Sequence, residues 1–186
     1  GVEVSEIEAA ETLIRAEERK RDAMAVLERA VEGRSIDALR STIEEATEAG
    51  VLEKLIEAAQ GVLQEEVEKA AASEELRGAL ESKALDALYS AVSRAKKAGV
   101  EASEISAAET VAAEEERKRD ALAALERAVE SRSIEELRSA LEEARAANTA
   151  EEPIVDAARV LAEEVEKVCL QLLCLLPFVW DFLVCF

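Results

Sequence analysis

The sequence predicts an all-α protein built from tandem helical repeats. Ala, Glu, Leu, Arg and Lys dominate the 186 residues, which is typical of long helices and coiled coils. Similar segments also recur every 49 residues, beginning at Val2, Val51, Val100 and Thr149, and a fixed period of this length is the signature of a repeat architecture. The chain therefore divides into repeats at 2–50, 51–99 and 100–148, a partial repeat at 149–167, and an apolar tail at 168–186.

Each repeat ends in a short amphipathic helix, expected to have about 14 residues. In 35–50 the apolar residues Ile36, Leu39 and Ile43 fall three and four positions apart, which places them on one face of a helix. Ser and Thr favour the N-cap, while Gly and Asn favour the left-handed backbone that ends a helix. The predicted structural caps are Ser35, Gly50, Gly99, Ser133 and Asn148.

A longer helix precedes each short one, and in the first repeat it is expected over about 4–32. This segment has no Pro and no Gly, and its centre, 15–22, is almost wholly charged. Acidic and basic residues four positions apart, such as Glu17 and Arg21, stabilise such an exposed helical stretch. The second repeat is the weak case, because Gly61 and Gly78 each cost its helix about 1 kcal/mol relative to Ala. Ser73 could cap a restarted helix there.

Alternating long and short helices joined by tight turns predict a topology. The short helix folds back on the second half of the long helix before it, and the next long helix covers both with its first half. The repeats then form an extended rod of three-helix bundles, which resembles the layout of spectrin-type repeats in architecture. The alternative is an αα solenoid, for which the long helix would have to break near 15–22.

Composition excludes several classes of function. A net charge of −19 repels phosphate backbones, so no nucleic acid is expected as a partner. The chain has no His, which removes the commonest general base and metal ligand. Acidic pairs occur throughout and carry no specificity for acid–base chemistry. We therefore expect no enzyme activity, no cofactor, no metal site and no small-molecule substrate. The basic runs 19–21 and 117–119 are interpreted as partners of the flanking acids rather than as docking patches.

The tail at 168–186 differs chemically from the rest of the chain. It holds all three Cys, and Asp181 is its only charged residue. Three interpretations stay open: a membrane anchor, a hydrophobic cap on the last bundle, or a segment foreign to the repeat, such as the product of an altered reading frame. Candidate membrane or interface contacts are Phe178, Trp180, Phe182 and Phe186.

These observations predict a non-catalytic structural spacer, a rod segment of a larger repeat protein. The alternative is a protein-binding scaffold that uses a helical face for a partner or for self-association, tethered to a membrane if the tail is a genuine anchor. The expected location is the cytoplasm, with membrane association through the tail as its alternative.

Overall fold

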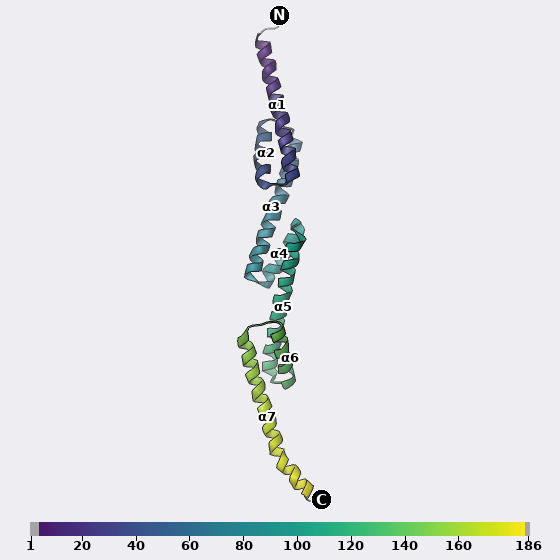
Figure 1. Cartoon of the computed structure of the whole chain (residues 1–186), viewed down its shortest axis with the longest axis vertical. Helices are drawn as coiled ribbons and strands as arrows, with labels where there is room; N and C mark the ends of the chain where they lie inside the picture. Colours follow the sequence, from purple (N-terminus) through teal and green to yellow (C-terminus); the bar gives the residue numbers. More distant parts are fainter. Residues whose placement is uncertain (1–3, 185–186) are drawn as a thin grey trace. The chain divides into compact units, whose positions relative to one another are not determined.

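The computed structural model describes residues 4–184, with side chains for residues 4–171. Residues 4–184 form seven helices and no strand, which confirms the predicted all-α class (Figure 1). The long helices are α1 (Val4–Gly33), α3 (Glu53–Ser82), α5 (Ala102–Ser131) and α7 (Glu151–Val184), and the short helices are α2 (Ile36–Glu48), α4 (Leu85–Ala98) and α6 (Ile134–Ala146).

The helix boundaries follow the 49-residue spacing of the sequence. The long helices begin at residues 4, 53, 102 and 151, and the short ones at residues 36, 85 and 134. The helices α1, α3 and α5 each contain 30 residues, and the short helices contain 13 or 14.

The long helices run without interruption through their charged centres. Both charged segments, 15–22 and 113–120, are helical throughout. The second repeat departs from our expectation, because α3 continues through Gly61, Ser73 and Gly78 and no restart occurs at Ser73. A Cβ atom at either glycine would meet no other group within 4 Å. The packing of the two halves of α3 against neighbouring helices outweighs the low helix propensity of the two glycines.

The chain comprises two compact units, which we describe separately. Unit 1 contains residues 1–82 and 87–108, and unit 2 contains residues 83–86 and 109–186. In unit 1 the second half of α1, the whole of α2 and the first half of α3 form the first bundle. Its core is lined by Leu27, Leu39, Ile43, Ala46 and Ala59, of which Leu39, Ala46 and Ala59 are fully buried.

A second set of buried residues in unit 1 joins the second half of α3 to α4. Leu76 and Leu88 are almost completely buried. Arg94 of α4 forms an ion pair with Glu75 of α3 at 2.5 Å. The start of α5 also lies against α3, because the Ser73 hydroxyl donates a hydrogen bond to Glu104 at 2.7 Å. The single helix α3 thus takes part in two helical assemblies.

The two buried stripes of α3 lie on nearly opposite sides of the helix. At about 100° per residue, Leu76 and Ala79 face roughly 200–260° away from Ala59. The first half of α3 consequently packs toward α2, and the second half packs on the other side, toward α4.

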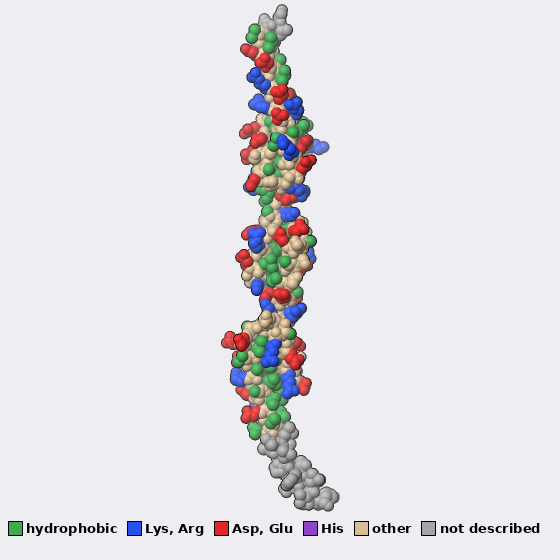
Figure 2. Space-filling model, in the orientation of Figure 1, with side chains coloured by type: hydrophobic (Ala, Val, Ile, Leu, Met, Phe, Trp, Pro, Cys, Tyr) green, Lys and Arg blue, Asp and Glu red, His purple; other side chains and the backbone are tan. Residues whose placement is uncertain are grey.

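In unit 2, the helices α5, α6 and α7 bury the equivalent residues. The core contains Leu125, Leu137, Leu141, Ala144 and Ala157. Alanine makes up much of this core, as it does in unit 1. Each bundle accordingly buries little apolar area, and much of the stability is expected to come from coupling between neighbours. Acidic and basic side chains are interspersed on the surface drawn in Figure 2.

Candidate functional site: the junction between helices

The most distinctive local geometry lies where a long helix passes into the following short one. One basic residue occupies this link in every repeat, with φ of 50° at Arg34, 54° at Lys83 and 54° at Arg132. This left-handed region costs a non-glycine residue about 1–2 kcal/mol. In each case two residues separate the long helix from the short one, and the basic residue, with this conformation, is the first of them.

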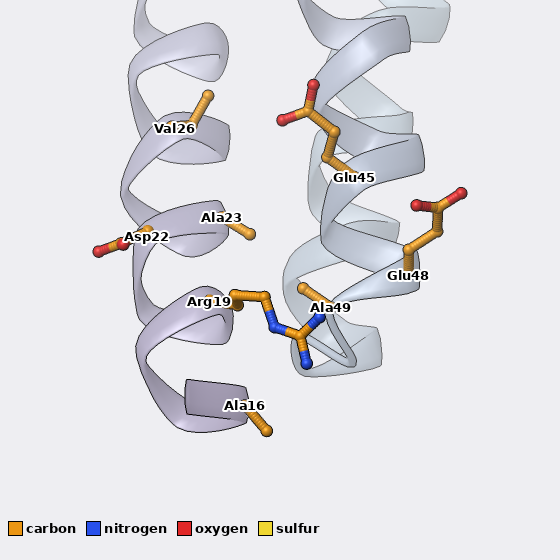
Figure 3. A pocket seen from close by; sticks show the side chains of 8 residues that line it. All are labelled: Ala16, Arg19, Asp22, Ala23, Val26, Glu45, Glu48 and Ala49. Carbon is orange, nitrogen blue, oxygen red and sulfur yellow. The ribbon is translucent and has the colours of Figure 1, made fainter. Parts of the chain in front are cut away.

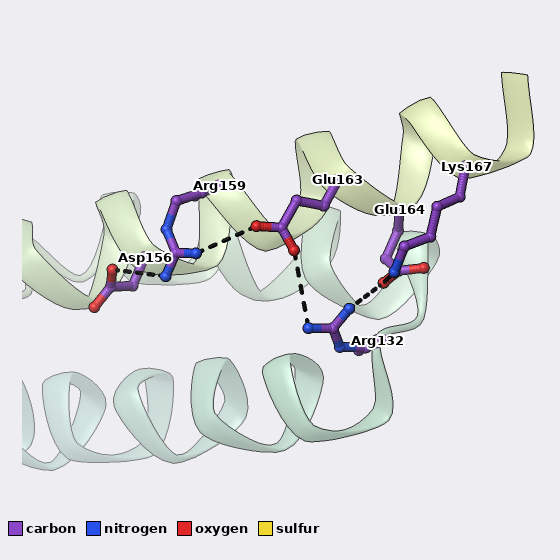
Figure 4. Close-up of polar contacts among 6 residues, drawn as sticks. All are labelled: Arg132, Asp156, Arg159, Glu163, Glu164 and Lys167. Atoms are coloured by element: carbon purple, nitrogen blue, oxygen red, sulfur yellow. Dashed lines mark hydrogen bonds and ion pairs between the residues drawn. The ribbon is translucent and has the colours of Figure 1, made fainter. Parts of the chain in front are cut away.

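The basic side chain at the link reaches the next long helix. Arg34 contacts a pair of glutamates on α3, with Nη1 at 2.9 Å from Glu66 Oε1 and Nη2 at 3.1 Å from Glu65 Oε2. Arg132 repeats this pattern on α7, with Nη1 at 2.7 Å from Glu164 Oε1 and Nη2 at 3.8 Å from Glu163 Oε2 (Figure 4). The ion pairs tie the end of one long helix to the middle of the next.

Local charges lower the pKa of two glutamates in these ion-pair networks. A hydrogen bond from Lys167 and a weaker one from Arg132 lower the pKa of Glu164, while partial desolvation opposes the change. For Glu115, the hydrogen bond from Lys118 dominates, and the charge of Lys83 adds to it. Lys83 occupies the same position in its repeat as Arg34 and Arg132 do in theirs, and its charge acts on the carboxylate of Glu115 in α5.

An open cleft lies beside two of these links. The cleft in unit 1 has a volume of about 550 Å³, and its counterpart in unit 2 has about 510 Å³. Corresponding residues of the two clefts are 49 positions apart. The lining includes Arg34, Glu66, Lys69 and Val100 in unit 1, and Lys83, Glu115, Lys118 and Thr149 in unit 2.

A third open groove runs between α1 and α2 and has a volume of about 610 Å³. Arg19 extends from α1 toward the end of α2, where Glu48 and Ala49 lie (Figure 3). The basic runs contact neighbouring acids on their own helices, since Lys118 lies 2.8 Å from Glu115 and Arg119 lies 3.4 Å from Glu116. These pairs are three positions apart, within the expected spacing of three or four, and they support the interpretation of the run 117–119 as helix-stabilising. In the run 19–21, Arg21 lies 3.7 Å from the adjacent Asp22.

The predicted glycine and asparagine caps lie at helix ends with left-handed φ. The values are 72° at Gly50, 71° at Gly99 and 58° at Asn148. In all three turns the next residue donates a backbone hydrogen bond to a carbonyl five residues earlier, at 3.0 or 3.1 Å, as in the Schellman motif.

The two predicted serine caps differ from each other. Ser133 Oγ accepts a hydrogen bond of 3.4 Å from the Glu136 amide, but the Glu136 carboxylate accepts from Ser131 Oγ rather than completing a capping box. Ser35 lies at the N-cap of α2, but its side chain makes no capping hydrogen bond.

The proposed tail contacts fall outside the part of the chain that can be described in full. The side chains of Phe178, Trp180 and Phe182, and the whole of Phe186, lie outside the described residues. Among the residues that are described, no helix is long and apolar enough to cross a membrane. Within the same part of the chain, no group of three or more acidic or cysteine side chains could hold a metal ion.

The chain matches no family model and shows no significant similarity to a curated protein or a solved structure. The junction must therefore be interpreted from its own geometry. Sequence reasoning missed the left-handed basic residues and their glutamate partners. The signal that could have identified them was a basic residue at 34, 83 and 132, followed 31 and 32 positions later by a pair of glutamates.

Proposed function

We propose that this protein is a non-catalytic structural spacer, a segment of a rod assembled from 49-residue units. The observation that carries the proposal is α3, a continuous helix that packs with α1 and α2 through its first half and with α4 through its second. A helix shared in this way sets the distance between the two groups of helices that pack on its halves. The ion pairs from Arg34 to Glu65 and Glu66 support α3 between its two packed halves.

The helix lengths predict how far each unit advances. A helix of 30 residues is about 45 Å long and one of 13 residues about 20 Å, so a spectrin-like layout advances about 25 Å per unit. An αα solenoid stacks helices side by side and advances only about 10 Å per layer. Measured length therefore distinguishes the two architectures.

We also propose that the protein needs no substrate and no cofactor for this role. The clefts beside the links present acids already paired with bases, as with Arg34 and Glu66. The Ser73 hydroxyl in the unit 1 cleft is hydrogen-bonded to a carboxylate. Such groups suit electrostatic support of the helices. The cytoplasmic location and the membrane tether through the tail remain predictions.

A protein-binding scaffold is the second candidate. The observation in its favour is a stripe of exposed apolar residues on the first half of α1, where Val4 is 72% and Ile14 is 58% exposed. Exposed apolar surface of this kind marks interaction sites. A spacer and a scaffold are compatible roles for one chain, because the stripe lies outside the three-helix packing of the first bundle.

Insertion of a further pair of units tests the spacer. A second copy of residues 51–148 is inserted directly after Asn148, which preserves the alternation of repeat types. The maximum dimension from small-angle X-ray scattering should increase by about 50 Å. A flexible Gly/Ser segment of equal length is the control, and circular dichroism should show unchanged helicity per residue only for the repeat insertion. An increase of about 20 Å or less would support the solenoid and contradict the proposal.

A further inference from the structure

The first half of α1 carries an apolar stripe that no described part of the chain covers. Ile7 is 49% exposed and Ile14 is 58% exposed, in line with the high exposure of Val4. At about 100° per residue, Ile7 and Ile14 face roughly 140–220° away from the buried residues Leu27 and Ala30 of the same helix. Because α2 packs on the Leu27 side, it cannot reach the stripe.

The equivalent stripes on later long helices are part of a core. Ile56 and Leu63 of α3, which lie 49 positions after Ile7 and Ile14, pack against the core of the first bundle. Ile154 and Leu161 of α7 do the same in unit 2. What covers them in both cases is a helical hairpin, formed by the second half of a long helix and the short helix that follows it.

Charge complementarity accompanies this apolar packing. Glu66, Glu115 and Glu164 are each 49 positions apart. Glu66 and Glu164 form ion pairs with the basic residue at the link of the covering hairpin, and Glu115 lines the same cleft as Lys83, the basic residue at its link. Glu17 occupies the same position on α1. The first half of α1 therefore has both the apolar and the acidic elements of a surface that elsewhere binds a hairpin.

We propose that the first half of α1 is a docking surface for the helical hairpin of a further 49-residue unit. The hairpin presents a Leu- and Ala-rich face to Ile7 and Ile14, and a basic residue with left-handed φ at its link to Glu17. This inference deepens the proposed spacer role and rests on its repeat arrangement. A second packed copy offers no uncovered hairpin, because α3 packs on α1–α2, the start of α5 lies against α3–α4, and α7 packs on α5–α6.

The sequence identifies the hairpin best suited as a probe. Residues 5–12 read SEIEAAET and residues 103–110 of α5 read SEISAAET. The start of α5 lies against the hairpin formed by the second half of α3 and by α4, as the Ser73–Glu104 hydrogen bond shows. Residues 64–98 contain this hairpin, including Lys83 at its link.

The experiment joins a copy of residues 64–98 to Gly1 of the full chain. The sequence Gly1-Val2-Glu3 repeats Gly99-Val100-Glu101, so the junction reproduces the natural one. Hydrogen exchange of the amides at 4–14 should slow by about tenfold or more relative to the unextended chain, because burial protects helical amides. The matched control carries Lys83→Glu in the added copy and should lose part of this protection. Adding Glu17→Lys to that control should restore it.

Exchange at 4–14 that is unchanged by the added hairpin would overturn the proposal. So would an unextended chain that sediments as a dimer with these amides already protected, since a second copy would then cover the stripe. Circular dichroism shows whether the added segment is helical, and a helical segment without protection also counts against docking. The scattering experiment inserts its units after Asn148 and does not involve the stripe, so that the spacer and the docking surface can fail independently.

Discussion

Replacing Gly99 with valine is expected to destabilise the turn between α4 and α5. Gly99 has φ of 71°, and the Val100 amide donates to the Ala95 carbonyl at 3.0 Å across the turn. Valine is β-branched and disfavours this region strongly. The turn must either hold a strained residue or give up the hydrogen bond that ends the helix.

The size of the effect follows from the surroundings of Gly99. A Cβ atom at this position would meet no atom within 4 Å, so no steric clash contributes. The cost is that of the left-handed backbone alone, about 1–2 kcal/mol in the free energy of unfolding. Asn148 occupies the same position in the third repeat with φ of 58°. Gly99→Asn is therefore the matched control and should cost less than about 1 kcal/mol.

Urea unfolding followed by circular dichroism measures both variants against the parent chain. The midpoint for Gly99→Val should fall clearly below that for Gly99→Asn, with an unchanged slope. Equal midpoints for the two variants would refute the argument from backbone conformation. A parent-like midpoint for Gly99→Val would show that the turn does not limit stability.

Three further substitutions test other parts of the structure. Leu88→Ala should lower the free energy of unfolding by about 2–5 kcal/mol, because the side chain is fully buried. Its control, Leu52→Ala, lies at a site that is 65% exposed and should change the urea midpoint little. Ser133→Ala should lower the free energy of unfolding by about 0.5–2 kcal/mol, because the capping hydrogen bond is lost. In thermal melts the melting temperature should fall less for Ser35→Ala, whose side chain makes no capping hydrogen bond. Glu164→Gln should destabilise the protein at neutral pH. Because the folded-state pKa of Glu164 is lowered, the difference from the parent should shrink as the pH falls through that pKa and vanish below it; a difference in urea midpoint that persists in strong acid would refute this assignment.

The helix boundaries could be predicted closely because each depends on a local signal. The stripe of Ile36, Leu39 and Ile43 and the following Gly50 gave a short helix that the structure places at Ile36–Glu48. The uninterrupted long helix was predicted from the absence of Pro and Gly in 4–32, and α1 runs from Val4 to Gly33. The restart that Ser73 could have capped does not occur, because propensity alone does not decide a helix that packs at both ends.

The basic links were harder to predict from the sequence. Gly33, the residue suited to a left-handed backbone, is the last residue of α1, and Arg34 takes the left-handed φ. Neither arginine nor lysine has a local preference for that conformation. In the structure the side chain of Arg34 reaches Glu65 and Glu66, which lie 31 and 32 residues away in the sequence. A contact of this range leaves no local pattern, and in the sequence it is indicated only by the glutamate pair that recurs 31 and 32 positions after each basic residue.

The opposed stripes of α3 set a condition on the length of its centre. One extra residue between Ala59 and Ala72 would rotate every later side chain by about 100°, turning Leu76 away from α4. An insertion of seven or eleven residues nearly completes whole turns and keeps the phase. The centre of α3 can therefore vary in composition, but it can change in length only by such steps, because its residue number determines the side of the helix on which α4 can pack.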